Sequence, residues 1–126
     1  MQNLKLAATK YTLAVDFDAE SGALELAGSS YPENAVDFFQ PLLDWVRGFI
    51  AEGARPLTVN FRLVYMNTSS TKCVLDLLEA LEQHVKAGGE VRVNWYYEED
   101  DEDIQEMGEE LSEDIGLPFT LIPVAR

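Results

Sequence analysis

The sequence predicts a single α/β domain with a mixed β-sheet that carries its helices mainly on one face. Three observations lead to this fold class. Segments with alternating apolar residues and segments with helical apolar spacing follow one another in the order ββαβαβαβ. The middle strands place polar residues at every second position, which predicts a second sheet face that is at least partly wet. The chain has 126 residues and is 47% hydrophobic, which suits one domain with a substantial core.

The first two strands are expected to form a hairpin over residues 9–28. Apolar residues alternate with polar ones from Tyr11 to Phe17, which is typical of a strand with one apolar face. Residues 20–22 (Glu-Ser-Gly) supply the turn, and a second short strand follows. Residues 28–32 (Gly-Ser-Ser-Tyr-Pro) are expected to end the hairpin.

The first helix is predicted from apolar residues that recur at three- and four-residue steps between Val36 and Ile50. Pro41 lies inside this pattern and removes one backbone donor. We therefore expect a short turn before Pro41 and the main helix after it. Gly53 is the expected stop.

The central part of the chain predicts a strand over 57–66, a helix over 74–85 that ends at Gly88-Gly89, and a strand over 91–97. His84, the only histidine, is expected away from the apolar stripe of that helix and therefore exposed. The polar second face of the two strands carries Asn60, Arg62, Arg92 and Asn94.

The last part of the chain predicts an acidic helix over 104–115 and a strand over 119–124. Pro118 and Pro123 bound the strand. Because proline has no backbone N–H to donate to a neighbouring strand, the strand is expected at an edge of the sheet.

The charge balance limits the classes of partner. The chain has 23 acidic and 9 basic residues, a net charge of −14, whereas nucleic acids and anionic membranes need clustered Lys and Arg. A basic partner surface is favoured instead. No apolar run approaches membrane-spanning length, and Cys73, the only cysteine, excludes an internal disulfide. We therefore expect one domain over residues 1–126, with a cytoplasmic location and Cys73 as a packed thiol.

Five small polar residues precede the second helix: Asn67, Thr68, Ser69, Ser70 and Thr71. One of them is enough to cap the helix, so capping alone is one explanation. The other is a hydroxyl exposed for phosphorylation, because a helix start offers unpaired N–H groups and Lys72 follows as a cation. A phosphate there would add about −1.5 to −2 charges.

An acidic run from Glu98 to Asp103 precedes the third helix. It is either a solvated helix start, where carboxylates suit the helix dipole, or a charged docking surface. It lacks the layout of a calcium loop, and no metal site is expected. The residues of the possible partner surface are Tyr96, Glu98, Glu99, Asp100 and Asp101.

The sequence holds no catalytic or cofactor motif that we can identify. One histidine gives no argument for a Ser-His-Asp set, and Gly88-Gly89 lacks the spacing of a phosphate-binding loop. The expectation is a protein without enzymatic activity or cofactor. The alternative is a small-ligand-binding or enzymatic domain that uses the polar sheet face through Arg62, Arg92 and Asn94.

Four motifs, in order, resemble the SiaC family of bacterial regulatory phosphoproteins, and the resemblance covers about residues 9–122. They are GSSYPENAVDFFQPLLDWV (28–46), FRLVYMNTSSTKCVLDLL (61–78), VNWYYEEDDEDIQEMGEEL (93–111) and LPFTLI (117–122).

The resemblance implies a fold like that of STAS-type anti-sigma-factor antagonists. It also implies a partner switch, in which the unphosphorylated protein binds and activates a diguanylate cyclase, raising cyclic di-GMP and promoting aggregation and biofilm. A serine/threonine kinase of the anti-sigma-factor type blocks this by phosphorylating Thr68, flanked by Asn67, Ser69 and Ser70, and a metal-dependent phosphatase restores it.

Overall fold

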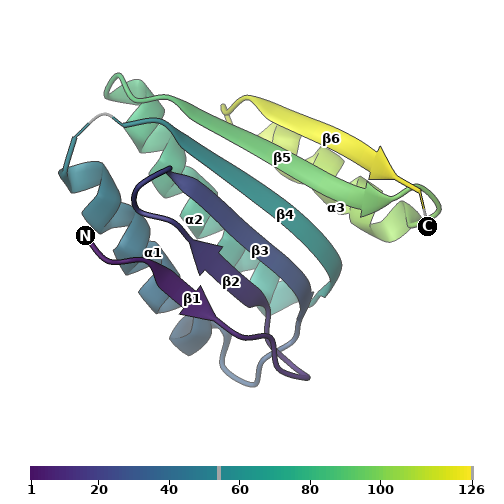
Figure 1. Ribbon diagram of the computed structural model, residues 1–126. Coiled ribbons are helices and arrows are strands. Elements are labelled where there is room, and N and C mark those ends of the chain that lie inside the picture. Colours follow the sequence, from purple (N-terminus) through teal and green to yellow (C-terminus); the bar gives the residue numbers. More distant parts are fainter. Residues whose placement is uncertain (54, 126) are drawn as a thin grey trace.

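The computed structural model describes residues 1–53 and 55–125 and folds them into a six-stranded sheet with three helices (Figure 1). The chain order confirms the predicted alternation of strands and helices and adds one short strand in front of it. The elements are β1 (Leu4–Leu6), β2 (Ala14–Phe17), β3 (Ala23–Ser30), α1 (Ala35–Ala51), β4 (Leu57–Met66), α2 (Thr68–Lys86), β5 (Val91–Glu98), α3 (Glu102–Asp114) and β6 (Phe119–Val124).

The strands lie in the sheet in the same order as in the chain, from β1 to β6. β1, β2 and β3 pair antiparallel, and β3 to β6 pair parallel. The sheet is therefore mixed, and the carboxyl ends of the four parallel strands lie at the same end of the sheet. Pro123 lies in β6, which is an edge strand as predicted.

All three helices lie on one face of the sheet, with α1 and α2 behind β1–β4 and α3 behind β5 and β6 (Figure 1). The core fills the space between the layers, and its largest fully buried side chains include Phe17, Phe49, Phe61 and Trp95. Burying one such side chain stabilises the fold by about 1.5–3 kcal/mol. The indole Nε1 of Trp95 donates a hydrogen bond to the carbonyl of Ile104 at 2.9 Å, which fixes α3 against β5.

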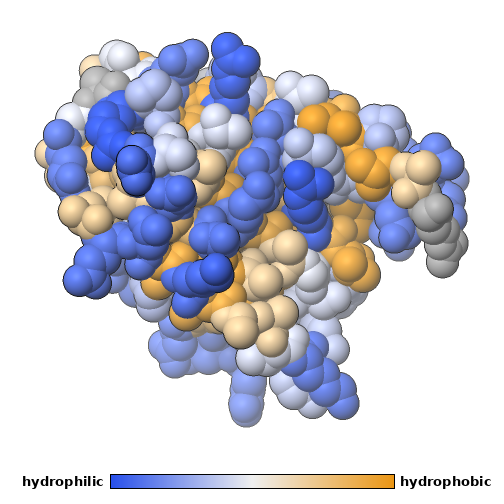
Figure 2. All heavy atoms as spheres, in the orientation of Figure 1, coloured by the Kyte–Doolittle hydropathy of each residue, from blue (hydrophilic) through white to orange (hydrophobic). Residues whose placement is uncertain are grey.

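The other face of the sheet is open, as the alternation predicted, and Figure 2 shows hydrophilic and hydrophobic side chains mixed on it. The strand register aligns one residue from each of the six strands in a continuous row across this face. The Asn94 side-chain amide donates to Asn60 at 2.9 Å, and that of Asn60 donates to Glu25 at 3.1 Å. The row is Lys5, Asp16, Glu25, Asn60, Asn94 and Thr120.

The first part of the chain differs from the prediction in two respects: a short strand, β1, precedes the hairpin, and the first hairpin strand begins at Ala14 rather than at Tyr11. β1 was not predicted, because three residues are too few to show a period. Contacts made elsewhere hold it: Trp45 Nε1 donates to the Gln2 carbonyl at 2.8 Å, and the Asn3 side chain accepts from Ala19 N at 2.8 Å. The hairpin itself ends as predicted, since the pairing of β2 with β3 stops at Ala27, and β3 then continues to Ser30 in pairing with β4 alone.

The predicted helix break at Pro41 was also wrong, because α1 runs without interruption from Ala35 to Ala51. Pro41 is exposed, so the carbonyl that loses its partner can bind water. Phe39 and Leu42 on either side are buried, and this packing holds the backbone helical through the proline.

His84 is buried rather than exposed, with a relative accessibility of 4%. It follows Leu77 and Leu81 at seven and three residues, a spacing that places it on the apolar stripe of α2. Its Nε2 lies 3.2 Å from the carbonyl oxygen of Arg55, so the buried ring has a polar partner. Within the described residues, no helix combines the length and the apolar character needed to cross a membrane.

Candidate phosphorylation site and docking surface

The five polar residues at the start of α2 have different tasks, and the helix begins at Thr68, earlier than predicted, so that four of them lie in its first turn. Asn67 is the N-cap, and its side-chain oxygen accepts a hydrogen bond from Ser70 N at 2.9 Å. The Thr71 hydroxyl donates to the Asn67 carbonyl at 3.0 Å. Ser70 is fully buried, and its Oγ lies 2.8 Å from Oγ of Ser30. Capping and burial thus account for three members of the cluster.

Thr68 and Ser69, together with Lys72, remain exposed to solvent in the first turns of α2. Within the part of the chain that the structure describes, the hydroxyls of Thr68 and Ser69 form no hydrogen bond. They stand where a helix leaves its first N–H groups without an intrahelical acceptor. Of the five polar residues, these two have hydroxyls that a kinase could reach.

A groove between α2 and α3 contains Thr68 at its α2 side. Met66, Leu75 and Met107 give it an apolar floor, since Met66 is buried and the other two are half-buried. We call this hollow the α2–α3 groove. Its lining residues are Met66, Thr68, Thr71, Lys72, Leu75, Asp103, Glu106, Met107 and Glu110.

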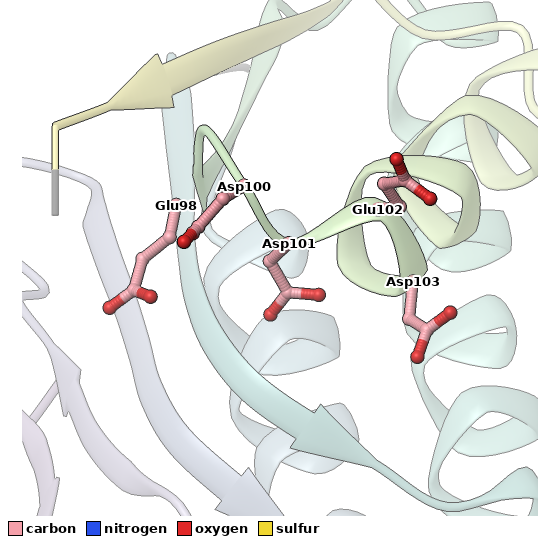
Figure 3. A pocket seen from close by; sticks show the side chains of 5 residues that line it. All are labelled: Glu98, Asp100, Asp101, Glu102 and Asp103. Atoms are coloured by element: carbon pink, nitrogen blue, oxygen red, sulfur yellow. The ribbon is translucent and has the colours of Figure 1, made fainter.

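The acidic run forms a second, shallow hollow where β5 leads into α3. Figure 3 shows the side chains of Glu98, Asp100, Asp101, Glu102 and Asp103 around it, with that of Glu102 pointing away from the other four in this view. Asp101 is the N-cap of α3 and accepts from Ile104 N at 3.1 Å, so part of the run has the structural task foreseen for it. Asp103 lines both hollows and joins the acidic run to the α2–α3 groove. No group of acidic, His or Cys side chains among the described residues could hold a metal ion.

The polar side chains proposed for a ligand site on the open sheet face are engaged within the sheet. Arg62 lies over the ring of Tyr96 at 3.9 Å from its centroid, and its Nε is 3.7 Å from a carboxylate oxygen of Glu25. Asn94 donates to Asn60, as described above, and Arg92 lies 3.8 Å from Glu90. Tyr96 therefore lies on the open face, opposite Arg62 in the register of β4 with β5.

Cys73 is half-buried between α1 and α2, in a hollow that Phe39 and Leu43 also line. Burial raises the pKa of its thiol, and the nearby carboxylate of Asp76 raises it further. A thiol held neutral in this way is a poor nucleophile, which agrees with the packed role expected for it.

An exposed aromatic cluster beside the site escaped the sequence reasoning. The ring of Tyr31 meets those of Tyr11 and Tyr65 at centroid distances of 5.2 and 5.8 Å. Strict alternation from Leu57 through Leu63 would bury Tyr65, yet it is 51% exposed and its neighbour Val64 is 65% exposed. The cause is a register shift opposite Gly28, where Val64 is an extra residue in β4 and the alternation restarts.

Residues 6–124 match the family described as SiaC family regulatory phosphoprotein. An uncharacterized protein of Pseudomonas aeruginosa strain UCBPP-PA14 is 40% identical over 121 residues, which cover 96% of each chain.

Solved structures of SiaC from Pseudomonas aeruginosa have the same fold. The apo-SiaC crystal structure is 39% identical, with a TM-score of 0.91 and coverage of 97% of this chain and 99% of that one. A second structure, of the diguanylate cyclase SiaD in complex with its activator SiaC, matches at 39% identity, with a TM-score of 0.92 over 96% and 99% of the two chains. The chain belongs to the SiaC family of regulatory phosphoproteins.

Proposed function

We propose that this protein, when unphosphorylated, binds and activates a diguanylate cyclase, and that phosphorylation of Thr68 blocks the interaction. The observation that carries the proposal is the place of Thr68, exposed in the first turn of α2 and lining the α2–α3 groove. The proposed output is more cyclic di-GMP and, through it, aggregation and biofilm.

The partner is supported by a relative that covers nearly the whole chain. SiaC from Pseudomonas aeruginosa has been solved in complex with the diguanylate cyclase SiaD as its activator, and its backbone superposes on this chain with a TM-score of 0.92. A shared fold at 39% identity over that length supports a partner of the same class. The protein then acts by binding and needs no catalytic activity of its own.

The physical effect of the phosphate follows from its surroundings. A dianion at Thr68 would stand beside the apolar floor of the groove and face the carboxylates of Asp103 and Glu106. Covering it with a partner would strip its water, and the desolvation penalty of a buried ion commonly exceeds the Coulombic gain from a new ion pair. A loss of about 3 kcal/mol weakens binding more than about a hundredfold, so no large rearrangement is required.

The enzymes that set the phosphorylation state are part of the proposal. A serine/threonine kinase of the anti-sigma-factor type would add the phosphate and a metal-dependent phosphatase would remove it. Exposure of the Thr68 hydroxyl supports access for both enzymes. The N-terminal N–H groups of α2 and the cation of Lys72 are close enough in sequence to stabilise the product.

Reconstitution tests this function directly. Cyclic di-GMP synthesis by the cyclase is measured with the unphosphorylated protein, the phosphorylated protein and Thr68→Ala after the same kinase treatment. We expect activation by the first and third and none by the second, with intact mass and site mapping to verify the phosphate. Ser69→Ala is the matched control, because its hydroxyl is also exposed and it should still be switched off by the kinase. Equal activation by phosphorylated and unphosphorylated protein would refute the proposal.

A further inference from the structure

We propose that the α2–α3 groove is the docking site for a segment of the diguanylate cyclase that carries apolar side chains flanked by Lys or Arg. This inference rests on the proposed function and assigns its contact surface. The juxtaposition that carries it is an apolar floor, an acidic rim and Thr68 in a single hollow.

The apolar floor of the groove favours a partner segment with apolar side chains. Leu75 and Met107 are half-buried and leave part of their surface open in the groove, with Met66 buried beneath. Methionine is unbranched and adapts its shape to an incoming side chain, which suits a surface that must be covered and uncovered. Burial of this floor would supply the non-directional part of the binding free energy.

The acidic rim of the groove favours a partner segment with positively charged side chains. Asp103, Glu106 and Glu110 are exposed along one side of the groove, and Lys72 is the one cation among its described lining residues. The whole chain has a net charge of −14, so its field adds to the local one. A cyclase segment with two or more Lys or Arg would be steered towards the groove and held in register by the rim.

The same arrangement explains how one phosphate could close the site. Thr68 lines the same groove as the floor residues, so a partner segment that fills the groove also covers whatever Thr68 carries. A hydrated dianion there would have to lose its water, whereas the basic groups of the partner are already paired with the rim. The gain from an extra ion pair is then smaller than the desolvation cost.

Charge reversal at positions of α3 inside and outside the groove tests the groove. Glu106→Lys/Glu110→Lys reverses two rim charges, and Glu109→Lys/Glu113→Lys makes the same change in net charge at exposed positions outside the groove. The affinity of the full-length protein for the cyclase is measured by titration calorimetry at 0.05 and about 0.3 M salt. We expect the groove pair to weaken binding roughly tenfold or more at low salt and to flatten its salt dependence, with the control pair within about threefold of wild type.

A third variant tests the floor without changing the rim. Leu75→Arg places a long side chain in the groove from a half-buried surface position of α2, and should abolish activation while the thermal transition stays near that of wild type. Equal losses from both charge pairs would mean that only net charge matters, and wild-type binding by the groove pair and Leu75→Arg would place the contact elsewhere. Either result overturns the inference.

The kinase experiment on Thr68 is interpreted separately, so the proposed function can hold even if the groove is not the docking site. Sedimentation of the protein without the cyclase tests whether a second copy of the chain occupies the groove. Self-association that the groove variants abolish would identify that copy as the occupant and would also overturn the inference.

Discussion

The side-chain oxygens of Ser30 and Ser70 lie 2.8 Å apart in a fully buried hydrogen bond between the end of β3 and the first turn of α2. A second bond runs in parallel, from Asn67 N to the Ser30 carbonyl at 2.9 Å. Together they fix the start of α2 against the sheet. The candidate phosphorylation site therefore stands on a rigid base, although its own hydroxyl is exposed.

Removing one of these serines should destabilise the fold. Ser70→Ala leaves the Ser30 hydroxyl buried without a partner, and the expected loss in the free energy of unfolding is about 1–3 kcal/mol. Ser30→Ala/Ser70→Ala should lose less free energy of unfolding than the sum of the single changes, because the double variant leaves no buried hydroxyl without a partner. Urea titration of the four proteins gives this coupling. Ser69→Ala, with its exposed hydroxyl, should stay within about 0.5 kcal/mol of wild type, and additive losses would show that the bond contributes nothing.

A glycine in α3 should resist replacement although alanine is the better helix former. A Cβ on Gly108 would lie 2.5 Å from Trp95 Cδ1 and Nε1 and 2.8 Å from Leu121 Cδ2. Gly108→Ala therefore overpacks the core beneath α3 and should cost about 1–3 kcal/mol. Gly48→Ala in α1 is the matched control, since its nearest new contact is the flexible end of Met1 at 3.1 Å. That change should be neutral or gain up to about 1 kcal/mol in thermal and urea unfolding. A stabilised Gly108→Ala would contradict the close packing of α3 on Trp95.

Patterning in the sequence was enough to predict most of the sheet and the face on which the helices pack. The alternation through β4 and β5 was strong because Phe61 and Trp95 face the core while Arg62 and Asn94 face outward. It failed where a tertiary contact overrides a local rule. The proline inside α1 and the three-residue β1 are both held by packing that no short window of sequence contains.

The candidate site was predictable in composition but not in arrangement. The polar cluster at the start of α2 marked the place, yet the hydroxyls of Thr68 and Ser70 look equivalent in the sequence and have opposite environments in the structure. The groove could not be foreseen, because Thr68 and Glu106 are 38 positions apart in the sequence numbering. The register shift that exposes Tyr65 depends on the pairing of β3 with β4, so alternation within β4 alone gave the wrong face.

A pH effect is expected at the other end of α2. The carboxylate of Glu82 accepts a hydrogen bond from Gly116 N and pairs with Lys86, and the backbone bond is the larger cause that holds the pKa of Glu82 below its ordinary value. Because the folded-state pKa is depressed, the stabilisation is present above the unfolded pKa of about 4.3 and is lost as pH falls through the folded value.

Glu82→Gln should therefore lower stability near neutral pH, and its difference from wild type should shrink as the pH is reduced from about 5 to 3. Urea titrations across this range measure the difference. Glu79→Gln, an exposed carboxylate on the same helix, is the control and should show no such trend. A difference that is constant with pH would mean that the Gly116 contact does not depend on the charge.

The role of charge at Thr68 can be separated from that of size by an isosteric pair. Thr68→Asp and Thr68→Asn differ in one negative charge and hardly in volume. If a buried charge is what closes the α2–α3 groove, Asp should weaken cyclase binding roughly tenfold and Asn no more than about threefold. Because desolvation is not screened by ions, the gap between the two variants should persist at about 0.5 M salt, where the contribution of exposed rim charges fades. Calorimetric titration of both variants at low and high salt measures this gap. Equal affinities for the Asp and Asn variants would show that the phosphate acts by its bulk, in which case a neutral Thr68→Tyr should block binding as the phosphate does.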